Sequence, residues 1–81
     1  MKLWVIIMVW GHVYAAAGPL NYSMWRCPLV LLKAKEMIDM RIAGGSEIYF
    51  KGRLVVRNAV TTKCVRSKTE PEAPMIIAIH S

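Results

Sequence analysis

Residues that carry enzyme chemistry are scarce in this chain of 81 residues. It has one aspartate, Asp39, and two histidines, and His80 lies one residue from the C-terminus. Nucleophilic catalysis needs a base that a third group holds rigidly, and a chain end does not provide one. The sequence therefore predicts no catalytic site, and we expect that the protein is not an enzyme.

Metal ligands and phosphate-binding loops are scarce as well. The two cysteines, Cys27 and Cys64, stand far apart, whereas a zinc site needs ligands in closely spaced groups. Gly44 and Gly45 lack the following lysine of a phosphate-binding loop. The methionines of the predicted helix are explained by packing. We expect neither a metal nor a cofactor.

Apolar sequence, in contrast, is concentrated at the N-terminus. Lys2 precedes an apolar run over residues 3–10, and small residues follow at 15–17. This order of basic, apolar and small residues is typical of a secretory signal peptide, so residues 1–17 are predicted to be one. The alternative is an uncleaved membrane anchor. It is disfavoured because the run must include a glycine, a histidine and a proline to reach the ~20 residues of a membrane span.

The two cysteines are expected to form a disulfide, because an even pair in an exported chain is normally bridged. Closing the Cys27–Cys64 loop would stabilise the fold by ~4 kcal/mol in the chain-entropy model. A domain this small buries roughly 60% of its unfolded surface, so the bridge would supply much of its stability. The alternative is two free thiols in a cytosolic protein. Asn21 opens an N-glycosylation sequon in segment 18–27, which we expect to be flexible.

One amphipathic helix is predicted to follow Cys27. Pro28 suits its first turn, and Gly44 and Gly45 come directly after its end. Apolar residues recur at helical spacing on one side, and charged residues occupy the other. The apolar set is Val30, Leu31, Ala34, Met37, Ile38 and Ile42, and the charged set is Lys33, Lys35, Glu36 and Asp39.

Apolar residues alternate with polar ones from Glu47 onward, which indicates strands with one buried face. The apolar members hold even numbers: Ile48, Phe50, Leu54, Val56, Val60 and Cys64. A three-residue turn at 51–53 would pair Phe50 with Leu54, so that apolar partners share a face. A second turn at 58–60 would place Leu54 opposite Cys64.

The C-terminal part contains a polar, proline-broken connection over 67–74 and an apolar run over 75–79. The run is either a fourth strand or a sticky tail. Together the elements predict a small single α+β domain over residues 28–81. In it, one amphipathic helix packs on a three- to four-stranded antiparallel sheet, and one disulfide joins the two.

Basic residues outnumber acidic ones by 11 to 5, for a net charge of +6. The predicted hairpins gather basic residues on one face, and more follow behind it. An extracellular protein, an anionic glycan or an anionic lipid surface would bind such a strip by summed electrostatic attraction, and nucleic acid is the less favoured partner. The alternative is an ordinary solvated face. The strip consists of Lys51, Arg53, Arg57, Lys63, Arg66 and Lys68.

The leading functional hypothesis is a small secreted, basic, disulfide-stabilised protein that acts as an extracellular ligand or effector on an acidic partner. Three alternatives stay open. The first is a membrane-anchored microprotein with an uncleaved N-terminal segment, and the second is a host-defence peptide, which the mixed charges of the helix disfavour. The third is a lineage-restricted protein without a settled molecular role.

Overall fold

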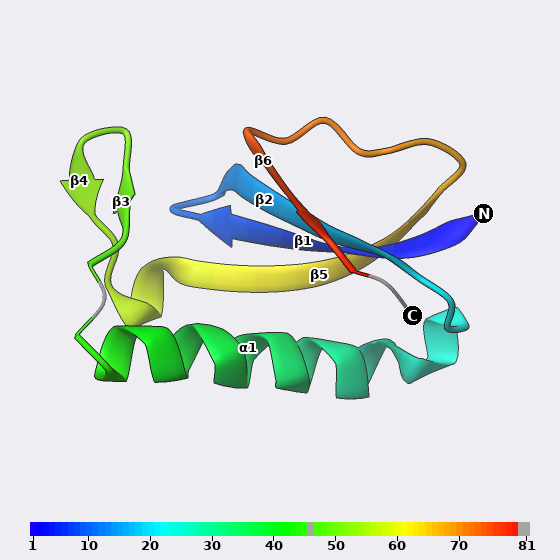
Figure 1. Cartoon of the computed structure of the whole chain (residues 1–81), viewed down its shortest axis with the longest axis horizontal. Helices are drawn as coiled ribbons and strands as arrows, with labels where there is room; N and C mark the ends of the chain where they lie inside the picture. Colours follow the sequence, from blue (N-terminus) through cyan, green and yellow to red (C-terminus); the bar gives the residue numbers. More distant parts are fainter. Residues whose placement is uncertain (46, 80–81) are drawn as a thin grey trace.

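A computed structural model of the chain describes residues 1–45 and 47–79, except for the side chain of Arg57. One long helix lies along one side of a four-stranded sheet, and a small hairpin stands at one end (Figure 1). The elements in chain order are β1 (Lys2–Val9), β2 (His12–Leu20), the 3-10 turn η1 (Met24–Arg26), α1 (Cys27–Ala43), β3 (Tyr49–Phe50), β4 (Arg53–Leu54), the 3-10 turn η2 (Arg57–Ala59), β5 (Val60–Ser67) and β6 (Met75–Ala78).

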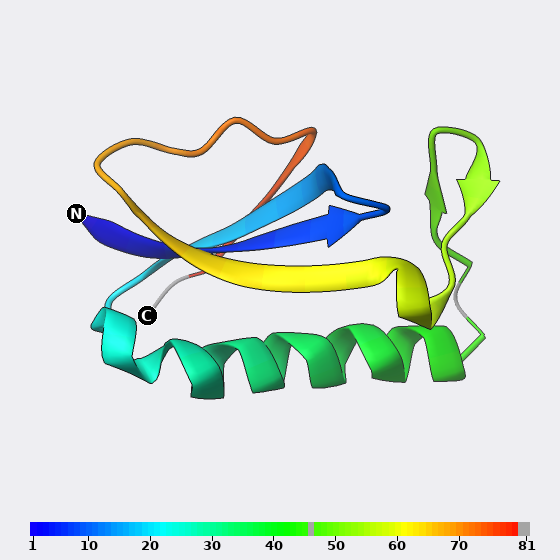
Figure 2. The same cartoon turned by 180° about the vertical axis from the view of Figure 1, so that it is seen from behind.

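The expected α+β class, with one helix on a sheet and one disulfide, is confirmed, but the sheet is mixed rather than antiparallel. Its strand order is β5-β1-β2-β6, and β3 pairs with β4 in a separate sheet. β6 runs parallel to β2, because the long connection after β5 crosses over before β6 begins. Seen from behind, α1 runs along the length of β5 (Figure 2).

The first two strands, which include the predicted signal peptide, form the centre of the larger sheet in the full chain. Leu3 and Val5 pack in the cluster on the helix side, and Trp4 and Ile6 pack on the opposite side with Ile76. A continuous apolar run suits such a strand, because both of its faces are buried. Cleavage after residue 17 would remove β1 and most of β2. Removal of this segment stays a prediction, and it is incompatible with the fold of the full chain.

Segment 18–27, predicted to be flexible, contains regular elements in the full chain. It completes β2, forms η1 and supplies the first residue of α1. Gly18 is required by a close approach, because a Cβ at this position would lie 2.8 Å from Cε3 of Trp4. The folded unit therefore includes the residues that precede the predicted 28–81 domain.

The helix has the predicted ends. Pro28 lies in its first turn, and the N–H of Gly44 donates to the carbonyl oxygen of Met40, 2.9 Å away. On the inner side, Val30, Leu31, Ala34 and Ile38 pack against the core. Lys35 donates a 3.0 Å hydrogen bond from its Nζ to the carbonyl oxygen of Val60, which joins α1 to the start of β5.

The register predicted for the first hairpin is wrong by one residue. The turn contains only Lys51 and Gly52, with φ of 53° and 77°, so Phe50 pairs with Arg53. Such two-residue turns match the twist of the paired strands better than other short turns. A slip of one residue exchanges the two faces of a strand. Val55 is therefore buried and Val56 exposed, the reverse of the prediction.

The second predicted hairpin is also wrong. β5 pairs along its whole length with β1, so Cys64 lies opposite Val5 rather than Leu54. The prediction assigned residues 1–17 to a signal peptide and so left out the longest apolar strand. The predicted run at 75–79 does form a fourth strand, β6, which ends at Ala78.

Candidate functional site

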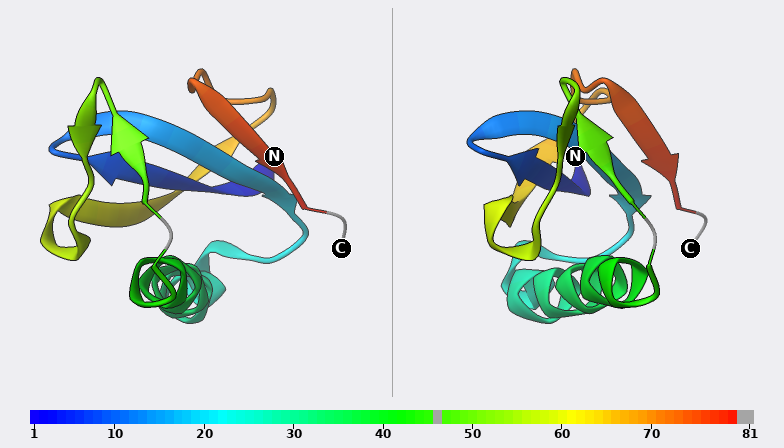
Figure 3. Two further views of the ribbon diagram at one scale, coloured as in Figure 1. Left: turned by 60° about the vertical axis from the view of Figure 1, so that its left-hand side comes forward. Right: turned by 90° about the vertical axis from the view of Figure 1, so that its left-hand side faces the viewer.

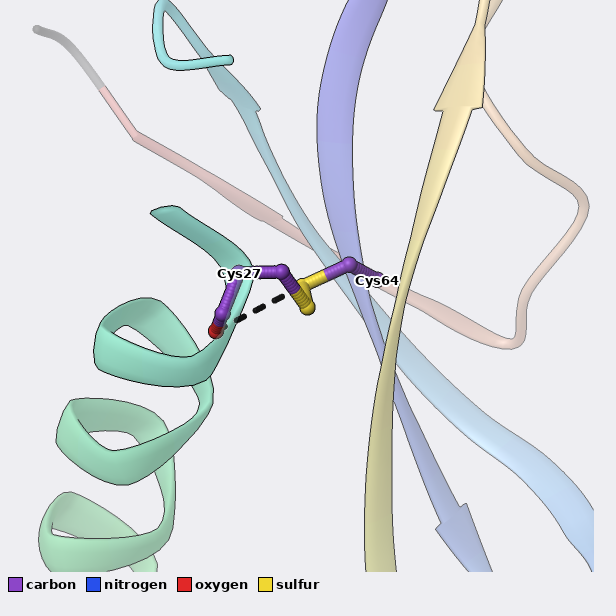
Figure 4. The surroundings of a disulfide bond; sticks show 2 residues. All are labelled: Cys27 and Cys64. Atoms are coloured by element: carbon purple, nitrogen blue, oxygen red, sulfur yellow. Dashed lines mark hydrogen bonds between the residues drawn. A yellow bond between two sulfur atoms is a disulfide. The ribbon is translucent and has the colours of Figure 1, made fainter. Parts of the chain in front are cut away.

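The predicted disulfide joins the first residue of α1 to the middle of β5 (Figure 4). The two Cα atoms are 6.1 Å apart, within the usual range for a bridge. Sγ of Cys64 also lies 3.8 Å from the carbonyl oxygen of Cys27. A bridged sulfur has no proton to donate, so we treat this as a packing contact. The bridge fastens the helix to the edge of the sheet and leaves no free cysteine in the part of the chain that the structure describes.

Two turns that are distant in sequence lie at the same end of the molecule (Figure 3). They are the β1–β2 turn at Trp10 and the β3–β4 turn at Lys51. The guanidinium carbon of Arg53 lies 4.7 Å from the centroid of the Trp10 ring, and Nζ of Lys51 lies 5.5 Å from that of Phe50. These distances are typical of cation–π contacts. We call this surface, made of Trp10, His12, Lys51 and Arg53 around the buried Phe50, the aromatic–basic end.

Phe50 connects the small hairpin to the larger sheet. Its ring meets that of Tyr14 edge to face, with centroids 5.5 Å apart, and it lies 6.4 Å from the ring of His12. Edge-to-face packing is a favoured aromatic geometry. Phe50 is buried in the helix-side core, so this contact fixes where Lys51 and Arg53 stand.

Trp10 is held in an uncommon backbone conformation. Its φ is 49°, in the left-handed region that glycine, asparagine and aspartate adopt most readily. Its N–H donates to the carbonyl oxygen of Ala59, 3.0 Å away, which ties the β1–β2 turn to η2. Trp10 is 36% exposed as a residue, and its ring lies beside the guanidinium of Arg53.

Tyr49, in β3, makes a local contact with the acidic residue Glu47. The hydroxyl of Tyr49 donates to the Glu47 carboxylate, 2.7 Å away. This hydrogen bond, with a smaller effect of desolvation, raises the pKa of Tyr49 above its ordinary value. Tyr49 is therefore a neutral hydrogen-bonding group at neutral pH.

The structure divides the predicted basic strip. Lys63 lies opposite Ile6, on the side of the sheet away from α1, whereas Arg66 lies opposite Leu3, on the helix side. Lys68 follows the last residue of β5, and the side chain of Arg57 lies outside the described residues. Among the members of the strip whose side chains the structure describes, Lys51 and Arg53 lie on the same hairpin, and they share their surface with an aromatic residue that the strip did not include.

Sequence reasoning missed Trp10 because it assigned this residue to the signal peptide. A usable signal was present. Trp10-Gly11 stands between two apolar runs, as Lys51-Gly52 does, and a residue followed by glycine at such a place favours a two-residue hairpin turn.

A second aromatic and basic cluster lies at the start of the helix. The guanidinium carbon of Arg26 is 5.6 Å from the ring centroid of Tyr22 and 5.1 Å from that of Trp25. The neighbouring Asn21 is exposed, and its Oδ1 accepts a hydrogen bond of 3.0 Å from Nζ of Lys2. The sequon is thus at the surface, and glycosylation of Asn21 stays a prediction.

Over residues 1–45 and 47–79, the histidine and acidic residues do not gather into a metal site. Among the described residues, no group of three or more His, Cys, Asp or Glu could hold a metal ion. His12 is exposed in β2, and His80 lies outside the described residues. In the described ranges no helix is both long and apolar enough to cross a membrane.

Comparison with known proteins finds no matching family model, no matching curated protein and no matching solved structure.

Proposed function

We propose that the full-length chain is a small disulfide-stabilised binding protein of the extracellular space, and that it holds an anionic partner at the aromatic–basic end. The observation that carries this proposal is the placement of Arg53 over Trp10 with Lys51 on the same turn. The Cys27–Cys64 bridge supports an oxidising compartment, because such bridges persist outside the reducing cytosol.

The chemistry of this surface favours carboxylate, sulfate or phosphate groups. Arginine presents several N–H donors in one plane and binds such groups in a bidentate manner. The ring of Trp10 restricts where the guanidinium of Arg53 can lie, so less side-chain entropy is lost when an anion binds. Lys51 adds a second positive charge on the same hairpin, which raises the local concentration of anions.

The division of the basic residues provides a matched test. A double variant Lys51→Ser/Arg53→Ser loses two charges at the aromatic–basic end, and Lys63→Ser/Lys68→Ser loses two charges elsewhere. We expect the first to weaken binding to heparin about tenfold, which corresponds to ~1.4 kcal/mol, and the second to weaken it much less. The measurement is isothermal titration calorimetry with the oxidised full-length protein at two salt concentrations.

Equal losses in the two double variants would contradict the proposal, because binding would then depend on net charge alone. Unchanged binding in both would remove it altogether. Vesicles that contain phosphatidylserine, used in place of heparin, separate a lipid surface from a glycan as the source of the anionic groups.

A further inference from the structure

The outward side of α1 carries large apolar side chains that the described elements leave uncovered. Leu29, Leu32, Met37 and Met40 are exposed by 67%, 59%, 60% and 73%. Viewed nearly along its axis, the helix has the sheet on one side only (Figure 3). Exposed apolar side chains that gather on one side of an element often mark an interaction surface.

The row formed by these side chains has apolar residues at both ends and one pair of opposite charges in the middle. Leu29 and Leu32 stand toward one end, and Met37 and Met40 stand toward the other. Between them lie two exposed residues of opposite charge, Lys33 and Glu36. Residues 29, 33 and 37 are spaced by four, as are residues 32, 36 and 40, which places both sets along one side of a helix.

We propose that this side of α1 is the two-fold interface of a homodimer, in which α1 packs antiparallel against α1 of a second copy. With the axis between residues 34 and 35, Lys33 meets Glu36 of the second copy, and its own Glu36 meets the other Lys33. The same axis brings Leu29 to Met40 of the second copy along the middle of the row, and Leu32 and Met37 lie on the two flanks of the interface. The middle of the row is then self-complementary, as a two-fold interface requires.

Charge favours a second copy over other occupants of this face. The chain has a net charge of +6, but on this row Lys33 and Glu36 cancel, so two copies approach here without a net repulsion from the row itself. A lipid surface would force Glu36, in the middle of the apolar row, toward hydrocarbon, where a carboxylate is costly. Packed helices lie about 8–10 Å apart, which allows the leucine and methionine side chains to interdigitate.

Charge reversal tests the pairing directly. Lys33→Glu alone places like charges opposite each other twice in the dimer, and so does Glu36→Lys alone. We expect each single reversal to raise the dimer dissociation constant at least about tenfold, and the double variant Lys33→Glu/Glu36→Lys to restore it. Sedimentation equilibrium of the oxidised full-length protein gives the constants. Lys68→Glu is the control for an equal change of charge far from α1.

Several outcomes would overturn the dimer. A wild-type chain that stays monomeric over the whole accessible concentration range would do so, as would a dimer that tolerates both single reversals. A monomer that binds anionic vesicles through Leu29 and Met40 would assign the face to a lipid surface instead. Circular dichroism of each variant establishes that it has folded, so loss of the dimer is separated from loss of the fold. The heparin measurement with Lys51 and Arg53 is independent of this result.

Discussion

Single residues in left-handed conformations shape the aromatic–basic end. Trp10 and Lys51 have φ of 49° and 53°, and each is followed by a glycine that completes a two-residue turn. Residues other than glycine, asparagine and aspartate adopt this conformation at a cost of roughly 1–2 kcal/mol. At these positions the two turns carry side chains that suit binding, an indole and an ammonium group. Glycine, asparagine or aspartate there would stabilise the turns more.

A substitution at Lys51 is expected to change the stability of the protein and its affinity for anions in opposite directions. Lys51→Asn places a favoured residue in the turn, so we expect the free energy of unfolding to rise by about 0.5–1 kcal/mol while affinity for heparin falls. Lys68→Asn changes the charge equally and should alter stability by less than about 0.5 kcal/mol. Urea unfolding and heparin titration of the two variants measure both quantities. A Lys51→Asn variant that is less stable would argue against the turn.

Strands are the elements whose partners and faces were hardest to predict. Phe50 was assigned to a buried face correctly, but Val55 and Val56 were assigned to the wrong faces, because the turn is one residue shorter than predicted. Strand side chains alternate with a period of two, so a small error in a turn changes every position after it. Helix ends are more robust, since proline and glycine signals act locally.

The two valines test the register. Val55 is 4% exposed and Val56 is 52% exposed. Val55→Ala removes two buried methyl groups, and we expect it to lower the free energy of unfolding by about 2 kcal/mol. Val56→Ala should change it by less than about 0.5 kcal/mol. Thermal or urea unfolding gives both values, and the opposite order would support the register with a three-residue turn.

For the whole molecule, the N-terminal hairpin supplies most of the core. Leu3, Val5, Ile7 and Val9 all belong to the cluster beneath the helix, and Trp4 and Ile6 anchor the opposite side. A chain without residues 1–17 would keep the residues of the helix, the disulfide and β5 but lose β1, which joins β5 to β2, and most of β2 itself. The fold of the full chain therefore requires residues 1–17, whereas the predicted cleavage removes them.

Truncation decides between them. We expect the full-length chain to unfold cooperatively, and the chain 18–81, with its disulfide formed, to lack a cooperative transition, because too little apolar surface remains to offset chain entropy. Circular dichroism on heating measures both. The N-terminal residue and intact mass of protein collected from secreting cells complete the test. A start at Gly18 together with cooperative unfolding would show that the mature chain has a different fold.

The bounds of the helix and the pairing of the cysteines followed from the sequence alone. Helix signals are local, and two cysteines allow only one bridge within the chain. Only the tertiary structure decided the partner of β5, the register at Lys51, and the contact between Trp10 and Arg53. The physical reason is that an apolar run such as residues 3–10 suits a signal peptide and a strand buried on both faces equally well. Which role it takes depends on whether distant parts of the chain bury it.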